Sequence, residues 1–218
     1  MIGVVIAVRN QAEYIAEALE SIAAQSVPTA EVVVVDDGST DDTARVAKAH
    51  GARVLSIERQ GPKVARLIGA RETTTPWLTF LDGDDRLCPR HHELLLAAAE
   101  AADTRAAYGM VAEFADAAVL EAGQFEVRTE PQLVPLTGTC LVERELYFEA
   151  MEADPDPKGH DWFPVAERIK RLAQVHELVL ERRIHGKNRT IVDRDEVHAA
   201  YLAAARAAIM RARGGGQE

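Results

Sequence analysis

Four consecutive valines at positions 32–35 are followed at once by two aspartates, Asp36 and Asp37. A continuous β-branched run is typical of a parallel strand that is covered on both faces, because a strand with one face in water alternates apolar and polar residues. The run therefore predicts a buried strand that presents two carboxylates at its carboxyl end.

Strands and helices alternate in the first part of the chain. The predicted order is strand 2–8, helix 11–25, strand 31–36, helix 41–50, strand 53–58, helix 62–73 and strand 77–82. This alternation predicts a single-domain α/β fold: a Rossmann-like, doubly wound, mostly parallel sheet with helices on both faces. In such sheets ligands bind beyond the carboxyl ends of the strands. The acidic motifs DD at 36–37 and DGDD at 82–85 both lie at such ends.

The pattern is weaker after Pro89. The elements expected there are a helix to about Ala102, strands near 105–114 and 124–129, a strand feeding a helix over 136–151, a loop at 151–159, a helix at 161–173, a strand at 174–185 and an Ala-rich helix at 195–213. We interpret His91 and His92 as a solvated helix start.

Composition narrows the class of protein. The 218 residues, 47% of them hydrophobic, suffice for one good core. A net charge of −10 disfavours a general nucleic-acid surface, because sequence-independent phosphate binding needs a basic stripe. Two separated cysteines, Cys88 and Cys140, indicate neither a disulfide framework nor a zinc site. We expect a cytoplasmic protein, because Met1 leads straight into a strand and no apolar run approaches ~20 residues. A peripheral membrane contact and a homodimer stay open.

The DGDD motif suggests chemistry on a diphosphate. Asp82 and Asp84 would repel an anionic ligand unless a divalent cation lay between them and it, and hard cations bind both carboxylate and phosphate oxygens. Such a cation would also stabilise a departing diphosphate. Gly83 would let the backbone approach the ligand without a Cβ. The acids Asp41 and Asp42, in contrast, are explained as a helix start capped by a preceding hydroxyl at 39 or 40.

Five motifs occur in order along the chain: VVIAVRNQAEYIAEALESIAAQS, EVVVVDDGSTDDT, QGPKVARLIGAR, WLTFLDGDD and LTGTCLVERELYFEA. Together they resemble the family 2 glycosyltransferases, which have the GT-A fold. The resemblance covers residues 2 to about 92, with weaker similarity to about 190. It implies that residues 1–102 form a nucleotide-sugar-binding half and 103–192 an acceptor-binding and catalytic half of one domain. A C-terminal helix and flexible tail would follow at 193–218.

The resemblance implies inverting, metal-assisted transfer of one sugar from a nucleotide-diphosphate sugar to an acceptor hydroxyl. A UDP-sugar is the favoured donor, and the acceptor is a glycan, a natural product or a peptide. Asp161 in GHDW would be the general base, since an attacking hydroxyl must lose its proton. Asp84 and His185 would bind the cation, Mn²⁺ or Mg²⁺. The implied nucleotide-binding positions are Ala7, Arg9, Asp36, Asp37, Arg66 and Asp82.

The chain also departs from the family pattern. Ala7 and Arg9 stand where Pro and Tyr are usual, Leu67 replaces an Asn, and His160 replaces the Glu before Asp161. A catalytically impaired nucleotide-sugar-binding protein is therefore one alternative. A sugar nucleotidyltransferase is another, although AVRNQAEY lacks the Gly- and Arg-rich phosphate loop expected after its first strand.

Overall fold

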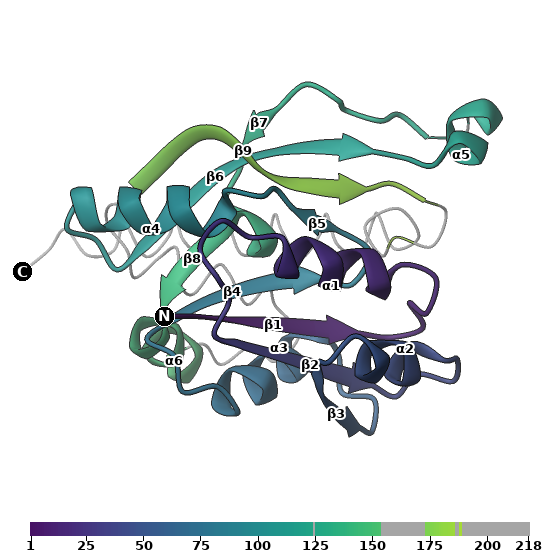
Figure 1. Cartoon of the computed structure of the whole chain (residues 1–218), viewed down its shortest axis with the longest axis horizontal. Coiled ribbons are helices and arrows are strands. Elements are labelled where there is room, and N and C mark those ends of the chain that lie inside the picture. Colours follow the sequence, from purple (N-terminus) through teal and green to yellow (C-terminus); the bar gives the residue numbers. More distant parts are fainter. Residues whose placement is uncertain (124, 154–172, 186–187, 189–218) are drawn as a thin grey trace, which may run out of the picture.

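The computed structural model describes residues 1–123, 125–153, 173–185 and 188 (Figure 1). In chain order the elements are β1 (Ile2–Val8), α1 (Ile15–Ala23), β2 (Glu31–Asp37), α2 (Thr43–Ala49), β3 (Arg53–Ile57), α3 (Pro62–Arg71), β4 (Trp77–Asp82), β5 (Arg86–Leu87), α4 (His91–Ala101), β6 (Ala106–Phe114), α5 (Ala117–Ala122), β7 (Gln132–Leu133), the 3₁₀ turn η1 (Thr137–Thr139), β8 (Cys140–Glu143), α6 (Arg144–Glu152) and β9 (Ala173–Arg183). The predicted base Asp161 and the predicted helix at 195–213 lie outside the described residues, as does nearly all of the predicted helix at 161–173.

One mixed sheet joins these strands in the order β3-β2-β1-β4-β8-β6-β9-β5, with β7 paired to β6. The pairs among β3, β2, β1 and β4 are all parallel, which confirms the doubly wound arrangement predicted for the first part of the chain. The second part is mixed: β8 runs antiparallel to both β4 and β6, β9 runs parallel to β6, and β5 runs antiparallel to β9.

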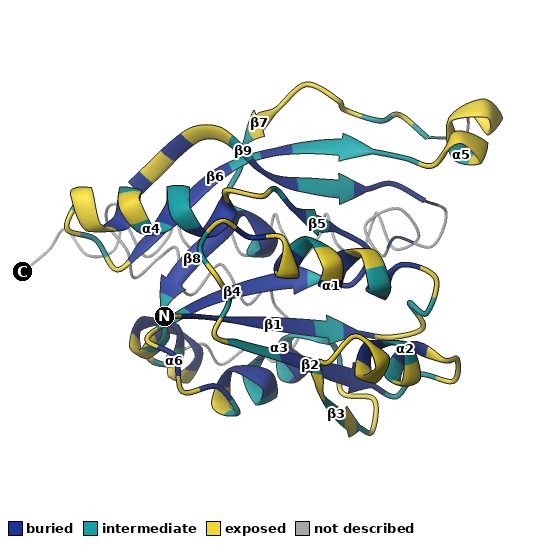
Figure 2. Cartoon of the chain, viewed as in Figure 1, coloured by how far each residue is buried: buried dark blue, intermediate teal, exposed yellow. Residues whose placement is uncertain are grey.

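The central strands are covered on both faces. In β1, Val4 and Ile6 belong to the core that α1, α2 and α4 cover, whereas Val5 packs with the α3 and α6 side. In β2, Val34 faces the first layer while Val33 packs in a cluster with Ala65 of α3. Figure 2 shows these strands as buried and the outer sides of the helices as exposed. The valine run is thus buried on both sides, as predicted.

The first two helices begin later than the periodicity predicts. Residues 11–14 form a turn in which the Gln11 carbonyl accepts the N–H groups of Tyr14 and Ile15. The helix predicted from residue 41 begins at Thr43, and no hydroxyl caps it. The Ser39 hydroxyl accepts the Asn10 N–H 2.9 Å away, so Ser39 links two loops instead of starting a helix.

The weaker second part of the pattern was predicted less well. The prediction of a strand near 124–129 is wrong for the described residues 125–129, which form no strand. They lie between the short helix α5 and the strand β7. The strands expected near 105–114 and 174–185 are present as β6 and β9.

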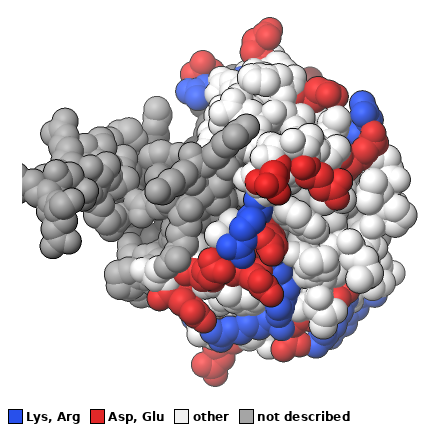
Figure 3. Space-filling view, turned by 90° about the vertical axis from the view of Figure 1, so that its left-hand side faces the viewer, with Lys and Arg blue, Asp and Glu red and all other residues white. Residues whose placement is uncertain are grey.

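None of the described helices combines the length and the apolar character that a membrane span requires. Figure 3 shows the face at the left-hand side of Figure 1, where β1 begins; on it acidic and basic side chains lie among one another, and the basic ones in view form no broad patch.

His91 and His92 are fully buried, so the solvated helix start expected there is wrong. Their rings form a chain of hydrogen bonds: His91 Nε2 to the Gly138 carbonyl (3.3 Å), His91 Nδ1 to His92 Nδ1 (3.0 Å) and His92 Nε2 to the Thr29 hydroxyl (3.0 Å). A carbonyl only accepts, so His91 Nε2 carries its proton, His92 Nδ1 donates to His91, and Thr29 donates to His92. Every ring nitrogen is then satisfied with both rings neutral.

Acid should destabilise this pair. Burial lowers the pKa of His92 from 6.5 to about 4, and burial, followed by the proximity of His92, lowers that of His91 well below its usual value. The unfolded chain therefore binds protons first, so the stability that the neutral rings provide is complete above about pH 6.5 and is lost as the pH falls toward 4. For His92 alone the loss between pH 7 and pH 5 is about 2 kcal/mol.

The measurement is urea unfolding at both pH values for the wild type and for His92→Gln, which cannot titrate. Burial raises the pKa of Asp85, which has the opposite pH effect, but Asp85 is common to both proteins and cancels in the comparison. We expect the wild type to lose more stability than the variant. Equal losses would contradict the neutral pair.

Gly69 lets α3 lie close to the sheet. A Cβ at this position would lie 2.4 Å from Val5 Cγ1 and 3.1 Å from Val35 Cγ2. We expect Gly69→Ala to lower the free energy of unfolding by about 1–3 kcal/mol through overpacking, although alanine is the better helix former. Chemical denaturation measures this, with Arg71→Ala on the exposed side of the same helix as the control. A variant as stable as the wild type would show that α3 can move off the sheet at no cost.

Candidate active site

The two acidic motifs flank the carboxyl end of β1. Val8 of β1 pairs with Asp36 of β2 on one side, and Ala7 pairs with Asp82 of β4 on the other. Because all three strands are parallel, both motifs reach the same edge of the sheet. Ala7 is half-buried between them and Arg9, just past the strand, is exposed.

Asp36 and Asp37 are buried and hold the loops that follow β2 and β3. Asp36 Oδ1 accepts the Ser39 N–H at 3.0 Å. The two carboxylate oxygens of Asp37 accept the N–H groups of Gln60 at 2.6 Å and Gly61 at 2.9 Å. Gly61 has a φ of +95°, which a residue with a Cβ rarely adopts, so this loop is shaped by a glycine and fastened by Asp37. Each oxygen of Asp37 retains a second lone pair for a ligand.

Asn10 fastens the loop after β1 to the loop after β2, and sequence reasoning did not identify it. Its N–H donates to the Ser39 hydroxyl (2.9 Å), and its Oδ1 accepts the Thr40 N–H (2.8 Å). Asn10 has a φ of +53°, a left-handed conformation that asparagine tolerates better than most residues. The asparagine of VRN, directly after a strand, was the signal for such a turn.

Arg66 and Asp82 form an ion pair across the edge. Arg66 comes from the second turn of α3, and its Nη2 lies 2.5 Å from Asp82 Oδ1. The arginine side chain is 10% exposed and the aspartate side chain is 46% exposed. A buried guanidinium thus reaches a carboxylate that is open to solvent and to a ligand.

Asp84 meets the end of β9. Its Oδ2 lies 3.0 Å from His185 Nε2 and 3.3 Å from Asn188 Nδ2, and all three residues are buried. Tyr14, just before α1, stacks on the His185 ring with centroids 4.8 Å apart. Residues about a hundred positions apart in the chain are therefore brought together by the pairing of β5 with β9.

Asp85 and Arg183 add further hydrogen bonds between the DGDD motif and the end of β9. Asp85 Oδ1 accepts the backbone N–H of Arg183 at 2.9 Å. The buried guanidinium of Arg183 donates to the Asp84 carbonyl (3.2 Å) and to Glu17 (2.5 Å), and it also bonds Asp116. Burial, and then the neighbouring charges of Asp84 and Asp82, raise the pKa of Asp85 well above its usual value. The sequence placed Asp85 in its acidic motif but gave no sign of its partner.

Gly83 serves packing within the protein. A Cβ there would lie 2.4 Å from Gln11 Oε1 and 2.6 Å from Val8 Cγ1. The small residue is thus needed for the contact with the end of β1, whereas the sequence interpretation assigned it to the approach of a ligand.

Asp84 and His185 could hold a divalent cation. Their facing atoms are 3.0 Å apart, the separation of two ligand atoms that each lie about 2.1 Å from one ion at an angle near 90°. The nitrogen donor favours Mn²⁺ over Mg²⁺, which prefers oxygen ligands. Within the part of the chain that the structure describes, no group of three or more His, Cys, Asp or Glu side chains is placed to bind a metal. A cation here would therefore depend on further ligands such as diphosphate oxygens.

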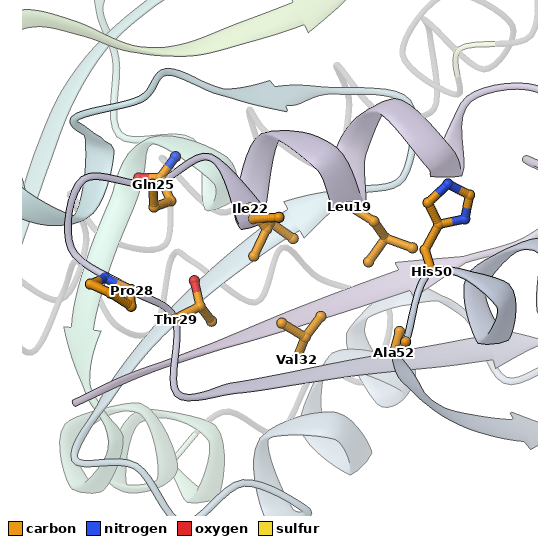
Figure 4. A pocket seen from close by; sticks show the side chains of 10 residues that line it. Leu19, Ile22, Gln25, Pro28, Thr29, Val32, His50 and Ala52 are labelled. Atoms are coloured by element: carbon orange, nitrogen blue, oxygen red, sulfur yellow. The ribbon is translucent and has the colours of Figure 1, made fainter.

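A cavity of about 240 Å³ lies away from this edge (Figure 4). Leu19 and Ile22 of α1, Val32 at the amino-terminal part of β2, and His50 and Ala52 after α2 line it. No carboxylate lines it and its walls are largely apolar, so it does not suit a cation or a diphosphate.

Comparison with known proteins places the chain in a family. The model of the glycosyl transferase family 2 matches residues 3–127. The succinoglycan biosynthesis protein ExoO of Rhizobium meliloti is 31% identical over 153 residues, which are 67% of this chain and 43% of that protein. ExoU of the same organism is 36% identical over 130 residues, 51% of this chain and 38% of that protein. The chain thus spans less than half the length of either relative.

Solved structures share the fold at low identity. Residues 1–349 of TarS of S. aureus, in complex with UDP-GlcNAc, superpose with a TM-score of 0.68 at 19% identity, over 86% of this chain and 59% of that fragment. Glucosyl-3-phosphoglycerate synthase of Mycobacterium tuberculosis with Mn²⁺ and UDP-glucose gives a TM-score of 0.65 at 22% identity, over 95% of this chain and 78% of that one.

The parallel half-sheet with acids at its carboxyl edge and the match over residues 3–127 lead to the same conclusion. This chain belongs to the family 2 glycosyltransferases.

Proposed function

We propose that this protein transfers one sugar from a UDP-sugar to an acceptor hydroxyl with inversion at the anomeric carbon. The observation that carries the proposal is the approach of Asp84 and His185 to 3.0 Å, at the edge where the other acids lie, in a chain of this family. The UDP-sugars held by TarS and by glucosyl-3-phosphoglycerate synthase support the choice of donor.

Different residues at the edge would bind different parts of the donor. Asp37 would accept a hydrogen bond from a base N–H, with Asp36 nearby and with Ala7 and Arg9 at the end of β1. Asp82 would face the ribose, and the Arg66 guanidinium, whose Nη2 lies 2.5 Å from Asp82 Oδ1, would hold its carboxylate in place. These assignments follow the family resemblance, and the shared edge of β1, β2 and β4 is compatible with them.

Asp84 and His185 would hold the cation, Mn²⁺ by preference. When bound, this ion neutralises the diphosphate and makes it a better leaving group. Without it, the carboxylates of the edge would repel the donor. The structure of glucosyl-3-phosphoglycerate synthase in complex with both Mn²⁺ and UDP-glucose supports the use of a cation.

Asp161 would act as the general base. The acceptor oxygen forms a bond to the anomeric carbon on the face opposite the diphosphate, and its proton passes to the Asp161 carboxylate. The bond between the anomeric carbon and the diphosphate oxygen breaks, and its electron pair leaves with the UDP. Residues 103–192 would supply the acceptor side.

Asp84→Asn should remove the dependence of UDP binding on metal. An amide oxygen is a weaker and uncharged ligand, so the affinity for UDP in the presence of Mn²⁺ should fall by ~10-fold or more. Isothermal titration with and without Mn²⁺ measures this. Asp42→Asn is the matched control, because it removes the same charge from an exposed carboxylate that pairs with Arg45. An unchanged Mn²⁺ effect in Asp84→Asn would contradict the assigned ligand.

Asp161→Asn should leave the affinity for Mn²⁺ and UDP unchanged and lower kcat by ~10²–10⁴, because only proton removal is lost. The readout is UDP release from UDP-glucose or UDP-GlcNAc with an acceptor that supports turnover by the wild type. Loss of UDP binding together with turnover would argue against the role of base. A wild type that binds the donor but turns over no acceptor of a broad panel would favour the nucleotide-sugar-binding alternative.

A further inference from the structure

Asn188 contacts both candidate metal ligands, and nothing in the sequence singled it out. Its side-chain Oδ1 accepts the backbone N–H of His185 at 2.5 Å. Its Nδ2 donates to Asp84 Oδ2 at 3.3 Å and to the Arg183 carbonyl at 3.0 Å. Asn188 is 7% exposed, so water cannot readily replace these partners.

The amide can sit in only one orientation. The His185 N–H needs an acceptor and the Asp84 carboxylate needs a donor, so rotating the amide by 180° would break both contacts. A backbone hydrogen bond from the Asn188 N–H to the His185 carbonyl, at 3.2 Å, closes the same turn. The side chain therefore has a fixed position relative to the two residues that it joins.

We propose that Asn188 is a positioning residue for the cation site, an inference that rests on the proposed function of Asp84 and His185. Its donation to Oδ2 fixes the rotation of the Asp84 carboxyl group. Its acceptance of the His185 N–H fixes the backbone that carries the imidazole. One amide thus sets the direction of both ligand atoms before a cation arrives, and outer-shell contacts of this kind tune metal affinity.

Gln25 offers a matched control. It is also 7% exposed, its Oε1 accepts the His92 N–H (3.2 Å), and its Nε2 donates to the carbonyls of Cys88 (2.9 Å) and Ser21 (3.1 Å). It follows α1 and precedes β2, so it lies toward the amino ends of the parallel strands, away from the acidic edge. Removing either amide deletes one buried acceptor and two donors, but only Asn188 touches the candidate ligands.

The first test compares Mn²⁺ affinity in UDP-saturated protein for the wild type, Asn188→Ala and Gln25→Ala, by titration calorimetry. We expect Asn188→Ala to bind Mn²⁺ about 10- to 100-fold more weakly. Gln25→Ala should bind as the wild type does, even where both variants melt at lower temperatures. Equal Mn²⁺ affinity in all three proteins would overturn the proposal.

The second test observes the ligand itself. Pulsed electron paramagnetic resonance detects a ¹⁴N nucleus bound directly to Mn²⁺, and His185→Ala identifies the signal of His185. At saturating Mn²⁺ and UDP, we expect this signal to be weakened or lost in Asn188→Ala and retained in Gln25→Ala. A full signal in Asn188→Ala would show that His185 reaches the ion without Asn188.

The metal site at Asp84 and His185 and the role of Asn188 can be disproved separately. If His185→Ala keeps the ¹⁴N signal, or the wild type binds UDP equally with and without Mn²⁺, the assigned metal site is wrong and the proposal falls with it. If the wild type behaves as expected and Asn188→Ala matches it, only the role of Asn188 is wrong. Should Asn188→Ala not fold, hydrogen exchange of the Asn188 side-chain amide in the wild type decides. Slow exchange in the Mg²⁺–UDP complex supports the proposal, and free exchange overturns it.

Discussion

Repulsion among carboxylates is the constraint that shapes the acidic edge of this protein, where the parallel strands have their carboxyl ends. The parallel strands β2 and β4, on either side of β1, bring five aspartates to one edge, and a different contact or effect offsets the charge of each. Backbone N–H groups hold Asp36 and Asp37, Arg66 faces Asp82, and Asp84 meets an imidazole and an amide. Asp85 has a pKa well above its usual value because it is buried beside two other acids. Contacts within the protein thus hold these carboxylates close together, but the edge keeps a negative charge toward a ligand. A diphosphate at this edge would therefore need a cation to offset the repulsion.

The edge depends on both halves of the sheet. The acidic motifs come from the parallel half, which is built from consecutive strand–helix units. The groups that hold Asp84 and Asp85 come from the end of β9, which reaches the motif because it pairs with β5. Arg183 extends this link to Glu17 of α1 and to Asp116, which precedes α5. The geometry at Asp84 therefore depends on contacts spread over most of the described chain.

The sequence predicted the features that local pattern controls. A continuous valine run and regular alternation are sufficient to place β2 and to bring the acids of 36–37 and 82–85 to one edge. The strand that feeds a helix within 136–151 is present as β8 and α6, but the two-residue strand β5 escaped prediction, because its pattern is short and its partner β9 is distant in sequence. His91 and His92 were misread because polarity alone suggests solvent, and only the tertiary fold supplies Thr29 and the Gly138 carbonyl as partners. Asn188 could not be found from sequence, since its contact with Asp84 spans 104 positions.

The central claim is that Asp84 and His185 hold one cation against the diphosphate of the donor. A crystal structure of the protein with Mn²⁺ and UDP, phased to reveal manganese by its anomalous scattering, tests it most directly. The account predicts a single anomalous peak about 2.2 Å from the Asp84 carboxylate and from His185 Nε2, in contact with the diphosphate. Bound UDP with the manganese peak elsewhere, or with the Asp84 side chain turned away from it, would contradict the account.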